Sequence, residues 1–133
     1  MRGKPSTKKK RPSLKTWAMA TRPKTLPAAF APVFTGAALA HSDDVFAFFP
    51  ALGALVGALL LQIGVNLAND YFDFKKGIDT PERLGPVRVT QSGLVAPETV
   101  KKAMILVFVA AGVVGIYLSL AGGPLVFLAG VAA

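Results

Sequence analysis

The sequence contains no cysteine, one histidine and only seven acidic residues among its 133 positions. The lack of cysteine excludes disulfide bonds, thiolate metal sites and a cysteine nucleophile. Charge is missing from two long stretches, because residues 45–69 and 103–133 hold no Asp, Glu, Lys, Arg or His. About 20 apolar residues cross a bilayer as a helix, so these stretches exclude an ordinary soluble domain of this length.

Hydrophobic residues make up 53% of the chain, which also excludes a disordered protein. The net charge of +8 is concentrated, because residues 1–24 carry nine of the fifteen Lys and Arg, and residues 74–102 carry the other six. Basic residues beside apolar stretches set membrane orientation, so we expect no nucleic-acid partner. The tail and the 74–102 loop are expected in the cytoplasm, in a multi-pass protein of the inner (plasma) membrane.

The apolar stretches and the turn signals between them predict an all-α fold, a polytopic transmembrane helix bundle. We expect a disordered basic cytosolic tail over residues 1–16 and the N-terminal part of a membrane domain over residues 17–133. The expected helices lie at about 24–41, 46–73 and 101–121, with an incomplete fourth at 124–133. The last stretch covers about 15 Å as a helix, half of the ~30 Å hydrocarbon core. This shortfall predicts a longer membrane protein whose C-terminal part lies beyond this chain.

The first apolar stretch has a rival interpretation. A basic start, an apolar run and Ala38-Leu39-Ala40 are typical of a cleavable signal peptide. Pro27 and Pro32 weaken that alternative, and so does the second apolar stretch that follows. We therefore expect a first membrane helix with a bent or broken start.

A polar stripe marks the end of the second apolar stretch. At about 100° per residue its members share an arc of about 100°. They are Gln62, Asn66, Asn69, Asp70 and Asp73. The two Asp residues lie one turn apart near a helix end, where they repel each other and the helix dipole disfavours anions. A divalent cation such as Mg²⁺ resolves this conflict, since it binds such oxygens and phosphates. The alternative is a helix end that simply reaches solvent.

The loop after this stripe supplies positive charge. Lys75, Lys76, Arg83 and Arg88 follow the carboxylates, and Asp79 adds a further acid. Arginine is suited to bidentate recognition of phosphate, whereas the two lysines also fit a simple role at a helix C-terminus. The pattern predicts a ligand with phosphate groups at this end of the helix.

The string NDYFD at residues 69–73, with Asp79 following, resembles the first Asp-rich motif of the UbiA superfamily of membrane prenyltransferases. The wider string NLANDYFDFKKGIDTPERLGPVRVTQSGL at residues 66–94 is similar to the 1,4-dihydroxy-2-naphthoate polyprenyltransferase branch of menaquinone biosynthesis. The commonest superfamily pattern is N-D-x-x-D-x-x-x-D. This sequence has Gly77 at the last position of that pattern, and its acid comes two residues later.

The resemblance implies a nine-helix bundle, about a third of which is present. It implies transfer of a polyprenyl group from an allylic diphosphate to an aromatic acceptor, here 1,4-dihydroxy-2-naphthoate, giving demethylmenaquinone. Mg²⁺ is the implied cofactor, and the implied metal ligands are Asn69, Asp70, Asp73 and Asp79. Asp70 and Asp73 are the implied catalytic residues. The implied diphosphate contacts are Asn66, Lys76, Arg83 and Arg88.

The sequence leaves alternatives open. The resemblance also implies a second acidic motif on a later helix, and no acidic residue follows Glu98 here, so we expect the isolated chain to be inactive. A sister enzyme acting on homogentisate, 4-hydroxybenzoate, or a haem or chlorophyll precursor would share the same diphosphate site. A small non-catalytic membrane protein is the other alternative, and it predicts no dependence on Mg²⁺.

Overall fold

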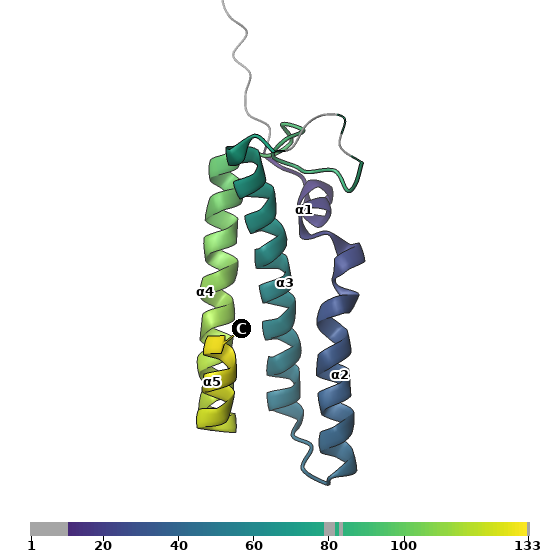
Figure 1. Cartoon of the computed structure of the whole chain (residues 1–133), viewed down its shortest axis with the longest axis vertical. Coiled ribbons are helices and arrows are strands. Elements are labelled where there is room, and N and C mark those ends of the chain that lie inside the picture. The colour runs from purple at the N-terminus through teal and green to yellow at the C-terminus, as the bar shows by residue number, and fades with distance from the viewer. Residues whose placement is uncertain (1–10, 79–81, 83, 133) are drawn as a thin grey trace, which may run out of the picture.

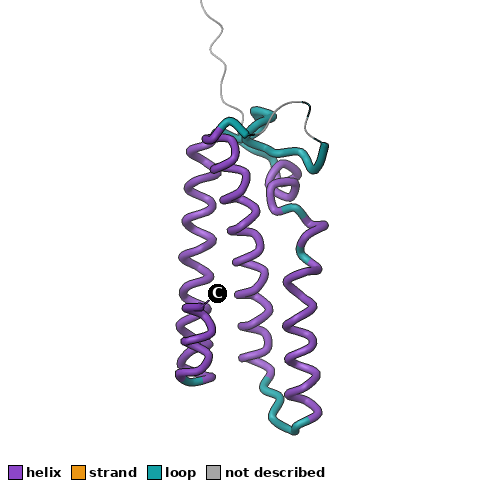
Figure 2. Tube along the Cα trace, viewed as in Figure 1, coloured by secondary structure: helices purple, strands orange, loops and turns teal. Residues whose placement is uncertain are grey.

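The computed structural model describes residues 11–78, 82 and 84–132. In this part of the chain all regular secondary structure is helical (Figure 2). The elements in chain order are α1 (Leu14–Thr21), a 3₁₀ turn η1 (Pro23–Thr25), α2 (Pro27–Ser42), α3 (Phe48–Lys76), α4 (Pro97–Gly122) and α5 (Pro124–Ala132). The all-α prediction is confirmed for these residues.

Two of the helices are long and apolar enough to cross a membrane. They are α3, with 29 residues, and α4, with 26 residues. At about 1.5 Å per residue both exceed the ~30 Å hydrocarbon core, whereas the 16 residues of α2 reach only about 24 Å. Few residues of α3 and α4 are buried within the structure, as expected of helices whose apolar side chains face lipid or further helices.

Helix α3 lies in the middle, between α2 on one side and α4 on the other (Figure 1). Helix α5 turns back along α4, and the turn is made at Gly123, whose φ of 80° favours glycine. The polar loop that follows α3 and the short helix α1 lie together at one end of the bundle. The connection between α2 and α3 lies at the opposite end.

Glycines on one face of α3 allow α4 to approach closely. A Cβ added at Gly64 would come within 2.8 Å of the Phe108 ring, and one at Gly53 would come within 3.0 Å of the Tyr117 ring. Small residues at such contacts are typical of membrane helices, because they let two backbones pack without a gap.

A small hydrophobic core lies at the loop end of the bundle. It joins residues from α1, α3, the loop and the start of α4; the members are Ala20, Leu67, Tyr71, Val89, Val95 and Val100. Val89 and Val100 have no exposed surface. The loop is therefore anchored by its own apolar side chains, and it carries Arg88 with it.

The helix boundaries differ from those expected in ways that local chemistry explains. Helix α1 was not predicted, and it begins within the expected tail because the Ser13 hydroxyl caps it by accepting from the Thr16 N–H. Helix α4 begins at Pro97, four residues early, since proline fits the first position of a helix. Residues 1–10, which make up most of the expected tail, lie outside the described part of the chain.

Candidate active site

The candidate site is the last part of α3 together with the segments packed around it. The helix continues beyond Asp73 to Lys76 and ends at Gly77, whose φ is 65°. The Gly77 N–H donates to the Phe74 carbonyl and the Ile78 N–H donates to the Asp73 carbonyl, a paired arrangement that closes a helix on glycine. The Asp and Asn residues of the polar stripe thus all lie on one continuous helix.

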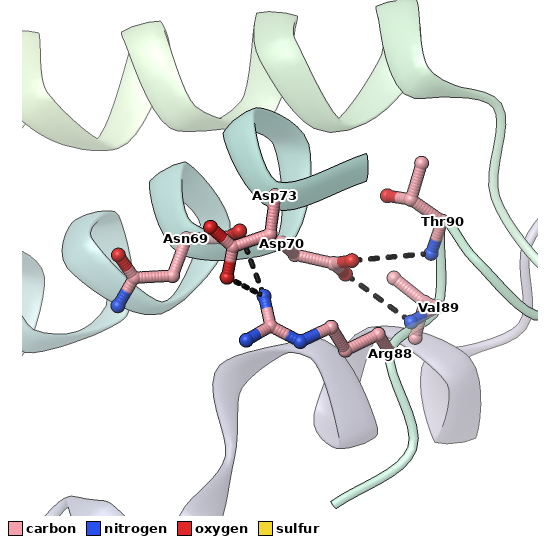
Figure 3. A network of polar contacts seen from close by, with 6 residues as sticks. All are labelled: Asn69, Asp70, Asp73, Arg88, Val89 and Thr90. Carbon is pink, nitrogen blue, oxygen red and sulfur yellow. Dashed lines mark hydrogen bonds and ion pairs between the residues drawn. The ribbon is translucent and has the colours of Figure 1, made fainter. Parts of the chain in front are cut away.

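Asp70 is buried, with 2% of its surface exposed. Its Oδ2 accepts from the Val89 N–H at 3.2 Å, and its Oδ1 accepts from the Thr90 N–H at 3.4 Å. Figure 3 shows the carboxylate pointing toward these two amides from α3. Both oxygens therefore bind the loop in this structure.

Asp73 lies one turn further along α3 and is only partly covered. Its Oδ2 lies 2.7 Å from Nη1 of Arg88, and that nitrogen also donates to the Asn69 carbonyl at 2.8 Å. Arg88 is 8% exposed, so its charge is held close to Asp73 instead of extending into solvent. The side chain of Asn69 is exposed and points away from Val89 and Thr90 in Figure 3.

The deeper end of the stripe is occupied differently. Asn66 is 3% exposed, and its Nδ2 donates to the Thr21 carbonyl at 2.8 Å and to the Thr25 hydroxyl at 2.9 Å. The amide of Gln62 reaches the same hydroxyl at 3.5 Å. These contacts tie α3 to the break between α1 and α2, where Arg22 has a φ of 51°. Here the stripe holds the bundle together.

Basic side chains gather around Tyr71, the residue that follows Asp70. The ammonium groups of Lys75 and Lys101 lie 5.6 and 6.0 Å from the centre of the Tyr71 ring, within the range of cation–π attraction. Lys76 is exposed at the end of α3. This end of the bundle can therefore attract an anionic ligand.

The structure brings together four of the predicted site residues, Asn69, Asp70, Asp73 and Arg88, and it places Asn66 one turn deeper. Asp79 and Arg83 lie outside the described residues. Within residues 11–78, 82 and 84–132, no three His, Asp or Glu side chains gather closely enough to hold a metal by themselves.

The sequence analysis did not identify several residues that form hydrogen bonds with the polar stripe. Thr21 lies on α1 and Thr25 on η1, and the amides of Val89 and Thr90 carry no side-chain signal in the sequence. The Ser13 cap and the run of turn residues before Pro97 were visible in the sequence. They could have indicated two ordered segments, but not which helix these segments contact.

The residues around this site also relate the chain to known proteins. The chain matches the UbiA prenyltransferase family over residues 29–133. It belongs to this family. UbiA proteins are polytopic membrane proteins, and this agrees with the two long apolar helices.

Individual UbiA relatives are similar to this chain over part of their length. The 1,4-dihydroxy-2-naphthoate octaprenyltransferase of Escherichia coli (strain K12) is 48% identical over 93 residues, covering 70% of this chain and 30% of the relative. The protein of the same name from Mycobacterium leprae (strain TN) is 39% identical over 118 residues, covering 89% and 40%. The chain thus spans about a third of the length of the curated relatives it matches. No solved structure matches it.

Proposed function

We propose that this chain forms the diphosphate-binding part of a Mg²⁺-dependent enzyme that transfers a polyprenyl group to an aromatic acceptor. One observation supports this proposal: in a UbiA-family chain, Arg88 binds both the Asp73 carboxylate and the Asn69 carbonyl at one end of α3. Both relatives are 1,4-dihydroxy-2-naphthoate octaprenyltransferases, and this favours 1,4-dihydroxy-2-naphthoate as the acceptor over the acceptors of sister enzymes. The product of that transfer is the prenylated naphthohydroquinone, which a separate two-electron oxidation converts to demethylmenaquinone.

The donor set fits Mg²⁺ bound together with a substrate. Mg²⁺ is held by one or two carboxylates plus waters and substrate phosphates, so a full protein cage is not needed. Asp73 and Asn69 offer a carboxylate and an amide oxygen on successive turns of α3, and Asp79 follows in the sequence as a further donor. Asp70 also belongs to the proposed site, although both its oxygens accept from the loop here.

Bound Mg²⁺ supplies charge neutralisation that makes the diphosphate a better leaving group. The residues of this chain bind and orient the departing group. Arg88 keeps a guanidinium beside Asp73, and Lys76 and Arg83 are the further proposed diphosphate contacts. Asn66 is the member of the proposed set that the contacts favour least, because its Nδ2 already binds Thr21 and Thr25.

The chemistry in such a site is an exchange of one bond for another. The allylic C–O bond breaks and the electron pair leaves with the diphosphate, whose charge the cationic side chains stabilise. An electron-rich ring carbon of the acceptor then forms the new C–C bond, and the ring carboxylate leaves as CO₂. The apolar surfaces of α3 and α4 suit a long prenyl tail, which explains a polar site at one end of membrane helices.

The proposal is tested by expressing the complete reading frame in membranes and measuring prenyl transfer from an allylic diphosphate to 1,4-dihydroxy-2-naphthoate. Removing Mg²⁺ with a chelator, or making Asp73→Ala, should lower the rate about 100-fold or more. Asp43→Ala is the matched control, since Asp43 is exposed at the C-terminal end of α2, where the connection to α3 lies at the opposite end of the bundle.

Normal activity in an Asp70→Ala, Asp73→Ala double variant would reject the proposed roles. Transfer to 4-hydroxybenzoate or homogentisate, and not to the naphthoate, would move the protein to a sister branch. Absence of any Mg²⁺-dependent transfer would favour a non-catalytic membrane protein.

A further inference from the structure

The loop between α3 and α4 contains a compact turn whose first amides need a partner. The Ser92 N–H donates to the Arg88 carbonyl and the Gly93 N–H donates to the Thr90 carbonyl, so residues 88–93 form a single helical turn. The first N–H groups of such a turn have no acceptor within it. Val89 and Thr90 hold these positions, and both are buried, with 0% and 3% of their surface exposed.

Asp70 supplies the missing acceptors from a different element. One of its oxygens binds each of the two amides, which is what a capping side chain does at the start of a helix. The turn is closed on its other side by the Val95 N–H, which donates to the Val89 carbonyl. Buried amides left without acceptors are costly, so Asp70 holds the turn in place through its oxygens.

Arg88 is the residue whose position depends on this restraint. It immediately precedes the two capped amides, and its Nη1 then reaches Asp73 at 2.7 Å and the Asn69 carbonyl at 2.8 Å. A shift of the turn would move the guanidinium away from the exposed end of α3. Small displacements of a positioned charge are expensive in catalysis.

We propose that Asp70 is a positioning residue: it caps the 88–93 turn and so fixes Arg88 beside Asp73, and it does not bind the metal itself. The catalytic meaning of this assignment rests on the proposed function, whereas the restraint on the turn does not. Asp70 and Asp73, which look alike in the sequence, thus have different tasks. Asp73 is the carboxylate that binds the metal and, through it, the diphosphate.

The restraint is measured by limited trypsin digestion of the protein in detergent without Mg²⁺. Because Arg88 is buried, the Arg88–Val89 bond should be cut slowly, and Asp70→Ala should speed that cut by about tenfold or more. Asp70→Asn keeps one acceptor oxygen and should give an intermediate rate. Asp43→Ala, an exposed aspartate at the other end, should match the wild type. Equal rates for Asp70→Asn, Asp43→Ala and the wild type would overturn the restraint, even if Asp70→Ala fails to fold.

Hydrogen exchange separates a positioning role from metal binding. In the wild type, adding Mg²⁺ with inorganic pyrophosphate should leave the Val89 and Thr90 amides protected, because the Asp70 oxygens stay on them. Because Asp70 is 2% exposed, a metal that bound it would have to draw the carboxylate out from beneath the turn, and this would weaken its bonds to both amides. Faster exchange of both on adding the ion and pyrophosphate would therefore overturn the assignment.

A double-variant cycle in the transfer assay tests the route through Arg88. If Asp70 acts by placing Arg88, then Asp70→Asn should lower the rate in the wild-type background and change it less than about twofold in an Arg88→Gln background. If the rate losses of Asp70→Asn and Arg88→Gln multiplied in the double variant, the assignment would be overturned. If the Asp70 variants loosen the turn but no prenyl transfer is found, only the proposed function fails. If transfer depends on Mg²⁺ but the Asp70 variants leave the turn unchanged, only this inference fails.

Discussion

The two halves of α3 are built in opposite ways. Toward the α2 connection, large apolar side chains such as Phe48, Phe49 and Leu52 are exposed, and the close contacts are made at glycines. Toward the loop, Asn66 and Asp70 are buried, with 3% and 2% exposed. A helix that exposes its apolar side chains and buries its polar ones is the reverse of a surface helix in a soluble protein.

The comparison shows what each half of the helix is for. The apolar half has no polar partners to satisfy, so it can face hydrocarbon and pack on α4 through small residues. The polar half is stable because the Asn66 Nδ2 group and both Asp70 oxygens find partners on other segments. Placing polar side chains within a membrane bundle costs free energy, and here these side chains are concentrated where the bundle meets the loop.

The largest difference between the halves should appear in side-chain packing. Leu67, in the loop-end core, is 2% exposed, whereas Leu61, less than two turns earlier, is 48% exposed. Leu67→Ala should lower the free energy of unfolding by about 2–5 kcal/mol, because it leaves a cavity. Leu61→Ala should cost less than about 0.5 kcal/mol. Denaturant unfolding in detergent measures both, and equal costs would mean that the two halves are equally packed.

A smaller effect is expected where α3 meets α4. Gly64→Val forces a side chain against the Phe108 ring and should cost about 1–3 kcal/mol through overpacking. Gly112→Val is the matched control on α4, since no atom lies within 4 Å of a Cβ built there. Thermal unfolding of the two variants gives the comparison. A loss as large in Gly112→Val as in Gly64→Val would contradict close packing at Gly64.

The smallest effect should come from the deeper part of the polar stripe. Asn66→Ala removes the bonds to the Thr21 carbonyl and the Thr25 hydroxyl and should cost about 1 kcal/mol. Asn69→Ala, at an exposed position one turn away, should leave stability unchanged within about 0.5 kcal/mol. Unfolding measurements in the absence of Mg²⁺ test structure alone. A stability loss at Asn69 but not at Asn66 would reverse the roles assigned to the two amides.

Much of the site could be predicted from the sequence because helical periodicity places residues reliably along one element. The stripe from Gln62 to Asp73 does lie on a single helix, and the family resemblance carried by residues 66–94 is confirmed by the match over residues 29–133. The roles assigned to its members stay predictions. The contacts show that Asn66 joins α3 to Thr25, which a periodicity argument does not reveal.

The order of residues alone settled which long segments are helical and apolar, where charge is excluded, and that cations follow the acids at the end of α3. Those properties follow from local spacing and composition. The tertiary structure decided which acid meets which donor, so that Asp70 holds two backbone amides and Asp73 holds Arg88. Residues about twenty positions apart are brought together by burial of Val89 and Val95 against Leu67 and Tyr71, and such packing has no periodic signature in the sequence.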